Sequence, residues 1–600
     1  MSTTLMNGYQ IYHGFLSGFM NINNDRQYLN KINVFPVADG DTGNNMVRTI
    51  SMIVKRLESS RSASAVLSDI ARISLYSARG NSGMIFSQYL NGLALYTAGK
   101  DKLTLEDFGQ AAQKSVSLAY ESIDNPVEGT MLTVLKAWSE SIYQGSMEKR
   151  NPDDIFHRAF KRASTVLEKT RDQLQVLKEN NVLDAGASGF VSFLKGMENL
   201  RFSGPVPLSL RKNVIDSSDR GTASPVISRH KATEKPQYRY CTEMLLNTKT
   251  AHRNKLRKDL IQLGDSLIIN EGLDRTRIHI HTNCPHEVAT RLKKYGTLSE
   301  QKADDMIRQE QVVNNRKSSI AVLTDSIADI PQEILDTEQI HVLNHKLSWG
   351  EDEFLDRVTI TPEQFYREQS RRKEFPGSSL PDAERVKAVY QYLTDYYDGI
   401  IVLPVAKSLS GTWNQMTKTA EPYNSREKKI AVIDTCLNSA AQGLLVREIA
   451  RQANEGKSLK ELTESAEVLK RKIHIYVSVS TFKYMVKGGR VSPMKGYLAA
   501  FLHLKPIVTL NAVGKGTAFD KAFTRKGLLK KISGIISETA RIKGIRSYAV
   551  VHAADPAKAE QFARSIEQAT GLAPDYMSSI SPIVGMHSGQ GAIAVAVITG

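Results

Sequence analysis

The sequence predicts a multidomain protein with a mostly helical first third, a small α+β middle segment and an α/β second half. In the first 200 residues, long stretches such as Asp69–Gln88 and Asp153–Lys178 space their apolar residues three or four apart, as amphipathic helices do. From Ser318 onward, buried-strand runs alternate with helical patterns, which favours a parallel sheet with helices on both faces. These runs are Ile320–Thr324, Gly399–Pro404, Ile430–Asp434, Ser547–His552 and Ala592–Ile598.

A polar segment that is poor in aromatic residues separates the first two parts and reads as a linker. The segment after it contains a predicted strand at Tyr240–Asn247, a helix at Arg253–Leu263 and a period-two strand at Arg277–Thr282. A chain of 600 residues is too long for one hydrophobic core. We therefore expect a helical domain at 1–208, a linker at 209–237, an α+β middle domain at 238–316 and an α/β domain at 317–600.

Composition limits the classes of protein and of partner. The net charge of +16 favours anionic partners, but the basic residues are spread along the chain, and we expect no nucleic-acid partner. The three cysteines are too few and too scattered for a disulfide framework, which favours a reduced, cytoplasmic setting. We expect neither a signal peptide nor a membrane-spanning segment.

The segment from Asn33 to Met46 contains the tripeptide Asp39-Gly40-Asp41. In an extended backbone, positions i and i+2 point to the same side, so the two carboxylates can share one cation or bridge two. Mg²⁺ prefers hard oxygen ligands and fills its other positions with water and phosphate oxygens. The tripeptide is also common in simple turns, and on its own it leaves both interpretations open.

Three further glycine-rich breaks interrupt the helical pattern. They are Ser77–Gly83, Pro126–Met131 and Asp184–Gly189, and each leads into a helical segment. Backbone N–H groups and hydroxyls at such a helix start suit phosphate. The same breaks are also consistent with ordinary helix caps.

Taken together, NVFPVADGDTGNNM, ARGNSGMIFSQ, NPVEGTMLTV and LDAGASGF closely resemble the kinase subunit of dihydroxyacetone kinases, in the variant of bacterial fatty acid kinases. The resemblance covers about residues 10–201. It implies an all-helical barrel that binds ATP through Mg²⁺, with Asp39 and Asp41 as metal ligands and catalytic residues. It also implies a nucleotide site formed by Asn33, Thr42, Asn45, Ser82, Gly83, Thr130, Met131, Asp184 and Gly186.

The middle segment carries three candidate zinc ligands, since Cys and His side chains suit that metal. Cys241 lies on one predicted strand, and His279 and His281 lie on another with the i, i+2 spacing of a shared face. By spacing alone, an ordinary polar sheet face explains these residues without a metal. The segment resembles the middle domain of the same kinases, which implies a zinc site and dimerisation. The sequence identifies no fourth ligand.

From Val322, the chain resembles the DegV family of fatty-acid-binding proteins. The matching segments are Pro376–Pro381, Lys407–Thr412, Val432–Thr435, Lys487–Ser492, Leu504–Ile507 and Met586–Gly591. The resemblance implies two α/β lobes that bury an acyl chain, with Ser378, Ser410 and His587 holding its carboxylate. Ser378 replaces the family's threonine and keeps the hydroxyl, whereas Leu380 replaces its glutamine.

The whole chain is therefore predicted to be a cytoplasmic fatty acid kinase, located peripherally at the membrane surface. It would use Mg-ATP to convert a carrier-bound long-chain fatty acid to an acyl phosphate for phospholipid synthesis. The expected partners are a membrane acyltransferase that uses acyl phosphate and a second copy of the chain in a homodimer. Three alternatives stay open: a kinase for a small molecule such as dihydroxyacetone, a non-catalytic lipid-binding regulatory protein, and, on charge alone, a nucleic-acid-binding protein.

Overall fold

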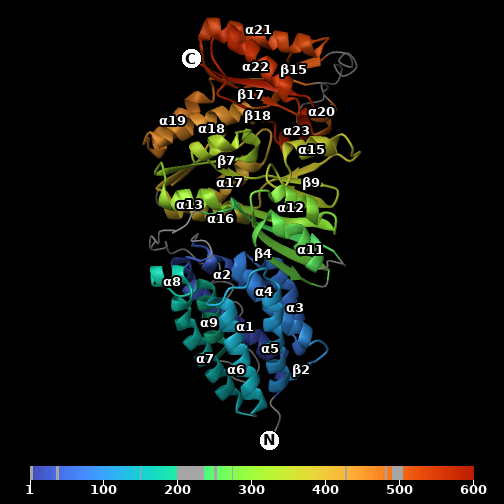
Figure 1. Ribbon diagram of the computed structural model, residues 1–600. Helices are drawn as coiled ribbons and strands as arrows, with labels where there is room; N and C mark the ends of the chain where they lie inside the picture. The colour runs from blue at the N-terminus through green and yellow to red at the C-terminus, as the bar shows by residue number, and fades with distance from the viewer. Residues whose placement is uncertain are drawn as a thin grey trace. The chain divides into compact units, whose positions relative to one another are not determined.

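The computed structural model describes residues 5–35, 40–148, 150–198, 236–248, 253–272, 274–425, 429–479, 483–489 and 505–600. Asp39 and most of the predicted linker, 209–235, lie outside the described residues. The chain divides into two compact units, Met1–Asn314 and Asn315–Gly600 (Figure 1). The helical part and the middle sheet belong to the same unit.

The first part of unit one is an assembly of helices around one core. The helices are α1 (Gly8–Lys31), α2 (Thr42–Arg56), α3 (Ala63–Ser77), α4 (Gly80–Tyr96), α5 (Leu105–Glu121), α6 (Met131–Met147), α7 (Pro152–Gln173), α8 (Gln175–Asn180) and α9 (Ala185–Glu198). A short antiparallel pair, β1 (Leu5–Asn7) and β2 (Lys102–Thr104), joins them. Edge-to-face contacts among Phe86, Trp138, Phe190 and Phe193 run through the core.

Two predicted helical stretches are each divided in the structure. The stretch Asp69–Gln88 breaks between α3 and α4, where Arg79 is extended and Gly80 has φ of 62°. α3 has already ended at Ser77, and the positive φ favours glycine at the first residue of α4. The stretch Asp153–Lys178 divides at Leu174, which is also extended.

The middle sheet has the order β4-β5-β3-β6 and is antiparallel throughout. Its elements are β3 (Tyr240–Asn247), α11 (Arg253–Leu260), the 3₁₀ turn η1 (Ile261–Leu263), β4 (Gly264–Glu271), β5 (Arg275–Thr282), α12 (Pro285–Leu292), β6 (Thr297–Asp305) and α13 (Met306–Asn314). The strand predicted at Tyr240–Asn247 is confirmed, and the second predicted strand begins two residues earlier, at Arg275. The predicted helix Arg253–Leu263 ends as a 3₁₀ turn.

The alternation of side chains gives this sheet two different faces. On β3 and β5, the apolar residues Met244, Ile278 and Ile280 are fully buried, and α11 and α12 pack against the sheet. Alternate positions on the same strands carry Cys241, Glu243, His279 and His281, which therefore share the opposite face.

Several hydrogen bonds join the sheet to the helical part. The backbone N–H of Ile269 donates to the Ser122 carbonyl at 2.9 Å, and the Asn270 side-chain amide donates to the Met84 carbonyl at 2.7 Å. Arg277 Nη1 donates to the Tyr76 carbonyl at 2.9 Å. These bonds fix the polar face of the sheet against α3 and α4.

Unit two begins with the predicted parallel sheet. Its order is β13-β12-β7-β8, and all pairs are parallel. The strands are β7 (Ile320–Asp325), β8 (His341–Leu343), β12 (Gly399–Leu403) and β13 (Ile430–Val432). Helices α14 (Gln332–Thr337), α16 (Ala383–Tyr396), α17 (Thr412–Ala420), α18 (Ser439–Asn454) and α19 (Leu459–Leu469) accompany it, together with the turns η2 (Ser326–Ala328) and η3 (Glu421–Asn424).

The second large sheet corrects the expectation of a parallel sheet. Its order is β16-β15-β14-β19-β17-β18, and only the β17–β18 pair is parallel. The strands are β14 (Ile473–Ser478), β15 (Lys505–Leu510), β16 (Gly516–Ala522), β17 (Ile545–His552), β18 (Tyr576–Ser579) and β19 (Ile593–Thr599). Helices α18, α21 (Arg525–Lys543) and α22 (Pro556–Thr570) pack against it. A strand buried on both faces reads as a continuous apolar run in either orientation, so the sequence pattern could not distinguish them.

The remaining elements of unit two include those that carry Ser378 and His587. Strands β9 (Lys346–Trp349), β10 (Asp352–Leu355) and β11 (Gly377–Ser379) form a small antiparallel sheet. Helices α15 (Pro362–Gln369), α20 (Lys483–Lys487) and α23 (Pro582–Ser588) complete the unit.

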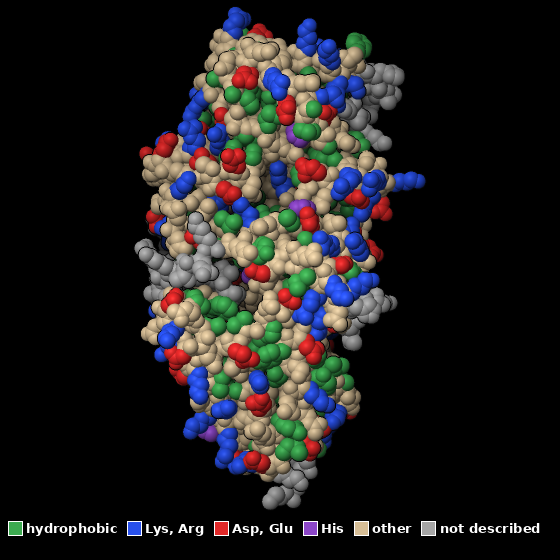
Figure 2. All heavy atoms as spheres, in the orientation of Figure 1, with side chains coloured by type: hydrophobic (Ala, Val, Ile, Leu, Met, Phe, Trp, Pro, Cys, Tyr) green, Lys and Arg blue, Asp and Glu red, His purple; other side chains and the backbone are tan. Residues whose placement is uncertain are grey.

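The described helices include none that is long and apolar enough to cross a membrane. On the face drawn in Figure 2, Lys and Arg side chains are interspersed with Asp and Glu over both units.

Candidate functional site

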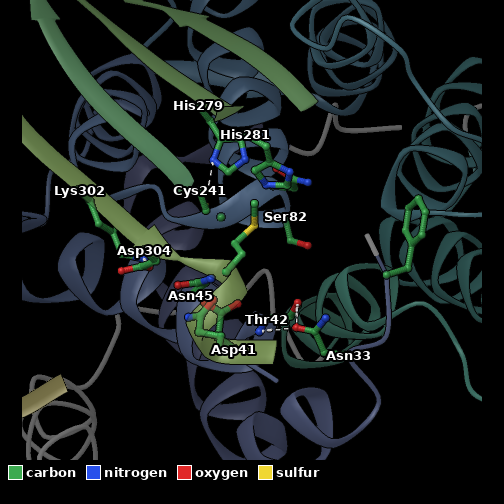
Figure 3. Close-up of a pocket in the computed structure, with 15 residues that line it drawn as sticks. Asn33, Asp41, Thr42, Asn45, Ser82, Cys241, His279, His281, Lys302 and Asp304 are labelled. Carbon is green, nitrogen blue, oxygen red and sulfur yellow. Dashed lines mark hydrogen bonds and ion pairs between the residues drawn. The ribbon is translucent and has the colours of Figure 1, made fainter. Parts of the chain in front are cut away.

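A pocket in unit one lies where the starts of α2 and α4 meet the polar face of the middle sheet (Figure 3). We call it the junction pocket. Its lining residues include Asn33, Asp41, Thr42, Asn45 and Ser82 from the helical part, and Cys241, His279, His281, Lys302 and Asp304 from the sheet. The amide groups at a helix start carry a partial positive charge and lack partners within the helix. Two such starts at one pocket suit a phosphate group.

The start of α2 is held by a polar side chain from the end of α1. Asn33 Oδ1 accepts hydrogen bonds from the Thr42 backbone N–H at 2.9 Å and from the Thr42 hydroxyl at 2.6 Å. Asp41 occupies the residue before the first helical turn and lines the pocket. The Asp41 carboxylate therefore lies beside the start of α2.

The start of α4 depends on close packing around small residues. A Cβ on Gly186, in the first turn of α9, would lie 2.4 Å from Ser82 Oγ. A Cβ on Gly83 would lie 2.7 Å from Thr49 Oγ1. These glycines therefore let α2, α4 and α9 converge behind the pocket.

The three candidate zinc ligands form a compact cluster in the same pocket. Cys241, His279 and His281 each offer a ligand atom, and these atoms lie within 4.8 Å of one another. Cys241 pairs with His281 across β3 and β5, and Cys241 Sγ lies 4.0 Å from His279 Nδ1. The structure therefore brings the three candidate ligands together.

The environment of this three-ligand cluster fits a metal ion. His279 is only 1% exposed, and its Nε2 atom has no hydrogen-bond partner among the described residues. Burial lowers the pKa of His279, which favours the neutral imidazole that metals bind. A buried, unpartnered ring nitrogen beside a thiol and a second imidazole is a donor set that suits zinc.

Glu243 supports the cluster from behind. Its carboxylate is fully buried and accepts hydrogen bonds from the Gly80 N–H at 2.7 Å and from Arg277 at 3.0 Å. Burial would raise the pKa of Glu243, but the hydrogen bond from His279 and the positive charges of Lys302 and Arg79 lower it to about 2. An ionised Glu243, 3.8 Å from His279 Nδ1, orients that ring.

Five predicted nucleotide contacts are not among the residues that line the pocket: Gly83, Thr130, Met131, Asp184 and Gly186. Asp184 is 5% exposed and accepts the Ala187 N–H at 2.7 Å at the start of α9. Burial raises the pKa of Asp184 to about 6, against hydrogen bonds from the backbones of Ala187, Met131 and Gly186. Asp184 thus ties the starts of α6 and α9 together, and contact with nucleotide stays a prediction for these five residues.

In unit two, the segments that carry Ser378 and Ser410, two of the residues predicted to bind the fatty acid carboxylate, lie close together. Ser378 lies on β11, and Leu380, two residues later, is the nearest neighbour of a Cβ built on Gly411, at 3.2 Å. Gly411 follows Ser410, whose hydroxyl lies 2.7 Å from Thr412 Oγ1. His587 lies on α23 and contacts Gly488, where an added Cβ would be 2.0 Å from His587 Nδ1.

The sequence interpretation missed several functional candidates. Lys302 and Asp304 line the junction pocket from β6, and their i, i+2 spacing on a strand was an available signal. In unit two, His345 Nε2 lies 3.4 Å from Thr412 Oγ1 and 3.7 Å from Asp325 Oδ2. Nothing in the local sequence around His345 marks that proximity.

Comparison with known families divides the chain into three matches. Residues 36–199 match the DAK2 domain, and residues 237–313 match the middle domain of FakA-like fatty acid kinases. Residues 319–600 match the model for uncharacterised proteins of the DegV family.

Individual relatives agree with these matches. An uncharacterised protein of Mycoplasma pneumoniae is 32% identical over 352 residues, which is 54% of this chain and 62% of that protein. One from Staphylococcus epidermidis is 31% identical over 350 residues and has the same coverage. This chain therefore spans under two thirds of those relatives. A DegV domain-containing protein of Clostridium acetobutylicum is 29% identical over 281 residues, 46% of this chain and 98% of that protein.

Solved structures similar to the chain include DegV of Bacillus subtilis, described as a fatty acid binding protein. It is 24% identical with a TM-score of 0.43, and the match covers 47% of this chain and all of that one. A fatty acid binding DegV family protein from Streptococcus agalactiae is 27% identical with a TM-score of 0.43, covering 47% of this chain and 99% of that one.

Proposed function

Because the chain combines a DAK2 domain, a FakA-like middle domain and a DegV domain, we propose that it is a fatty acid kinase. In this proposal, unit one binds ATP and unit two holds a long-chain fatty acid. The γ-phosphoryl group of ATP is transferred to the fatty acid carboxylate, which gives an acyl phosphate and ADP.

The junction pocket is the observation that carries this proposal. Two helix starts, the Asp41 carboxylate and the three-ligand cluster line one pocket. Phosphoryl transfer depends mainly on positioning and on neutralising phosphate charge, so it needs helix amides and metal-binding carboxylates more than a general base. The fatty acid carboxylate has a pKa near ~4–5 and is already a nucleophile at neutral pH.

Two metals are part of the proposal. Asp39 and Asp41 would hold Mg²⁺, since carboxylates together with phosphate oxygens match its preference for hard oxygen ligands. Cys241, His279 and His281 would hold zinc, and bound zinc supplies a positive charge that polarises an adjacent oxygen.

The proposed reaction balances without a proton donor. A carboxylate oxygen forms a bond to the γ-phosphorus, and the bond between that phosphorus and the bridging oxygen of ATP breaks, so ADP leaves with the electron pair. In this step amides at the start of α4 hold phosphate oxygens, while Asn33 accepts the Thr42 N–H and keeps the start of α2 in place. The product hydrolyses in water, so the second unit would shield it until an acyltransferase takes it.

The test of this function is the choice of acceptor. With Mg-ATP and the full chain, long-chain fatty acid should stimulate ADP formation, whereas dihydroxyacetone should not. Stimulation by dihydroxyacetone would instead favour the small-molecule kinase. ATP and fatty acid that both bind without turnover would favour the regulatory protein.

Ser410 and His587 are predicted to hold the fatty acid carboxylate together with Ser378. A buried carboxylate is costly unless several donors reach it, so losing one donor should cost roughly 1–3 kcal/mol, or about 5–150-fold in affinity. We expect this loss in the full chain for Ser410→Ala and for His587→Ala, measured by titration with a fluorescent fatty acid. ATP affinity should stay unchanged.

The matched control is Ser537→Ala on α21, where the hydroxyl donates to the Ser533 carbonyl of its own helix. This variant should bind fatty acid like the unmodified chain. Equal fatty acid affinity in all three variants would rule out the proposed carboxylate contacts.

A further inference from the structure

Lys302 projects from β6 into the junction pocket, on the wall formed by the middle domain (Figure 3). It is the only Lys or Arg among the described residues that line this pocket. Its ammonium group forms an ion pair with Asp304, and its side chain is 17% exposed. Lys302 pairs across the sheet with Glu243, the residue that supports His279.

The ammonium forms its ion pair with Asp304 in a pocket that the Asp41 carboxylate also lines. Burying most of a charged side chain costs free energy, and the ion pair with Asp304 offsets only part of it. A second anion, bound next to the ammonium, would explain why Lys302 lies in this pocket.

Transfer of a phosphoryl group to a carboxylate brings two anions together. The described carboxylates of the pocket suit metal ions and add further negative charge around the phosphates. A fixed cation that reaches the transferring group is a recurring requirement of phosphoryl transfer, because charge is spread over its three equatorial oxygens. Lys302 is the protein side chain that meets this requirement in the described pocket.

We propose that Lys302 is a catalytic residue whose ammonium donates to an oxygen of the transferring phosphoryl group, and that Asp304 is the positioning residue that aims it. The inference rests on the proposed function, since it requires ATP phosphates in the junction pocket. It gives the middle domain a direct part in transfer: β6 contributes the cation, while α4 contributes the amides.

The test uses the full chain and two measurements. The first is turnover of Mg-ATP with fatty acid. The second is binding of Mg-ADP with and without aluminium fluoride, a mimic of the transferring phosphoryl group that needs no acyl acceptor. Lys302→Met should lower kcat by about 10²–10³-fold, as loss of one preorganised donor does. It should weaken the aluminium fluoride complex by a similar factor and change Mg-ADP affinity by less than about threefold.

Three further variants separate charge from folding. Lys302→Arg keeps the charge and should recover part of kcat. The double variant Lys302→Met/Asp304→Asn removes both charges of the ion pair together and should still lose the aluminium fluoride complex. Lys258→Met, at an exposed position on α11, is the matched control and should behave like the unmodified chain. Zinc content and Tm are measured for every variant.

The outcomes are distinguishable. Equal aluminium fluoride binding by the unmodified chain and by both Lys302→Met variants overturns the proposal. Equal weakening of Mg-ADP alone and of its aluminium fluoride complex would mean a structural role and also overturns it. If fatty acid does not stimulate turnover but Lys302→Met selectively loses the aluminium fluoride complex, the proposed acceptor is wrong and the role of Lys302 stands.

Discussion

Asp41→Asn should reduce ATP turnover with fatty acid by about 10²–10⁴-fold, because the variant keeps the shape of the side chain but loses a charged Mg²⁺ ligand. A metal that neutralises phosphate charge contributes several kcal/mol, and each 1.36 kcal/mol corresponds to a tenfold change in rate. Asp41 lines the junction pocket directly before α2. Asp41→Ala should abolish turnover. The measurement is the rate of ADP formation at saturating ATP across a range of Mg²⁺ concentrations.

The control for this prediction is Asp69→Asn on α3, an exposed carboxylate that pairs with Arg72. It should leave turnover unchanged. All of these variants should retain fatty acid in unit two, since the change lies in unit one. Near-normal turnover by Asp41→Ala would mean that the metal site is assigned to the wrong residues.

Cys241→Ser should remove a zinc ion and with it most of the activity. We expect about one zinc per chain by elemental measurement of protein purified without chelators. Loss of a thiolate ligand from the three-ligand cluster should leave well under half of that zinc. Because a bound metal stabilises the transition state by several kcal/mol, its loss should lower the turnover rate by about 10²-fold or more.

Cys284→Ser provides a matched control within the same domain. Cys284 is also a free thiol but stands at the start of α12, outside the cluster. This variant should keep both zinc and turnover. Full activity of a purified chain that contains no metal would contradict a zinc site at Cys241, His279 and His281.

The sequence predicted local structure well where a side-chain pattern determines it. The strand predicted at Tyr240–Asn247 has the observed bounds of β3, and the i, i+2 spacing of His279 and His281 placed both imidazoles on one face. The glycine breaks correctly located the starts of α4 and α9. Each of these predictions depends only on residues that are neighbours in sequence.

Tertiary docking explains what sequence reasoning could not provide. The predicted metal loop near Asp41 and the predicted zinc ligands are 200 residues or more apart in the chain, yet they line one pocket. They meet because bonds such as Arg277 to the Tyr76 carbonyl fix the sheet against α3 and α4. The importance of Lys302 follows from that docking: its i, i+2 spacing with Asp304 indicates a shared strand face, but not that this face lines the pocket.

The predicted strand orientation in unit two was wrong because it also depends on tertiary structure. The last strand, β19, inserts between β14 and β17 and runs antiparallel to both. Its run of buried apolar residues is the same in either direction, so only the path of the chain decides the orientation.

The most direct test of the central claim is to identify the product. The full chain is incubated with Mg-ATP and a long-chain fatty acid in the presence of hydroxylamine, which converts an acyl phosphate to a hydroxamate, and the products are measured by mass spectrometry. A fatty acid kinase should give one fatty hydroxamate for each ADP, with none in the absence of ATP. ADP formation that fatty acid does not stimulate, with no hydroxamate above background, would contradict the account.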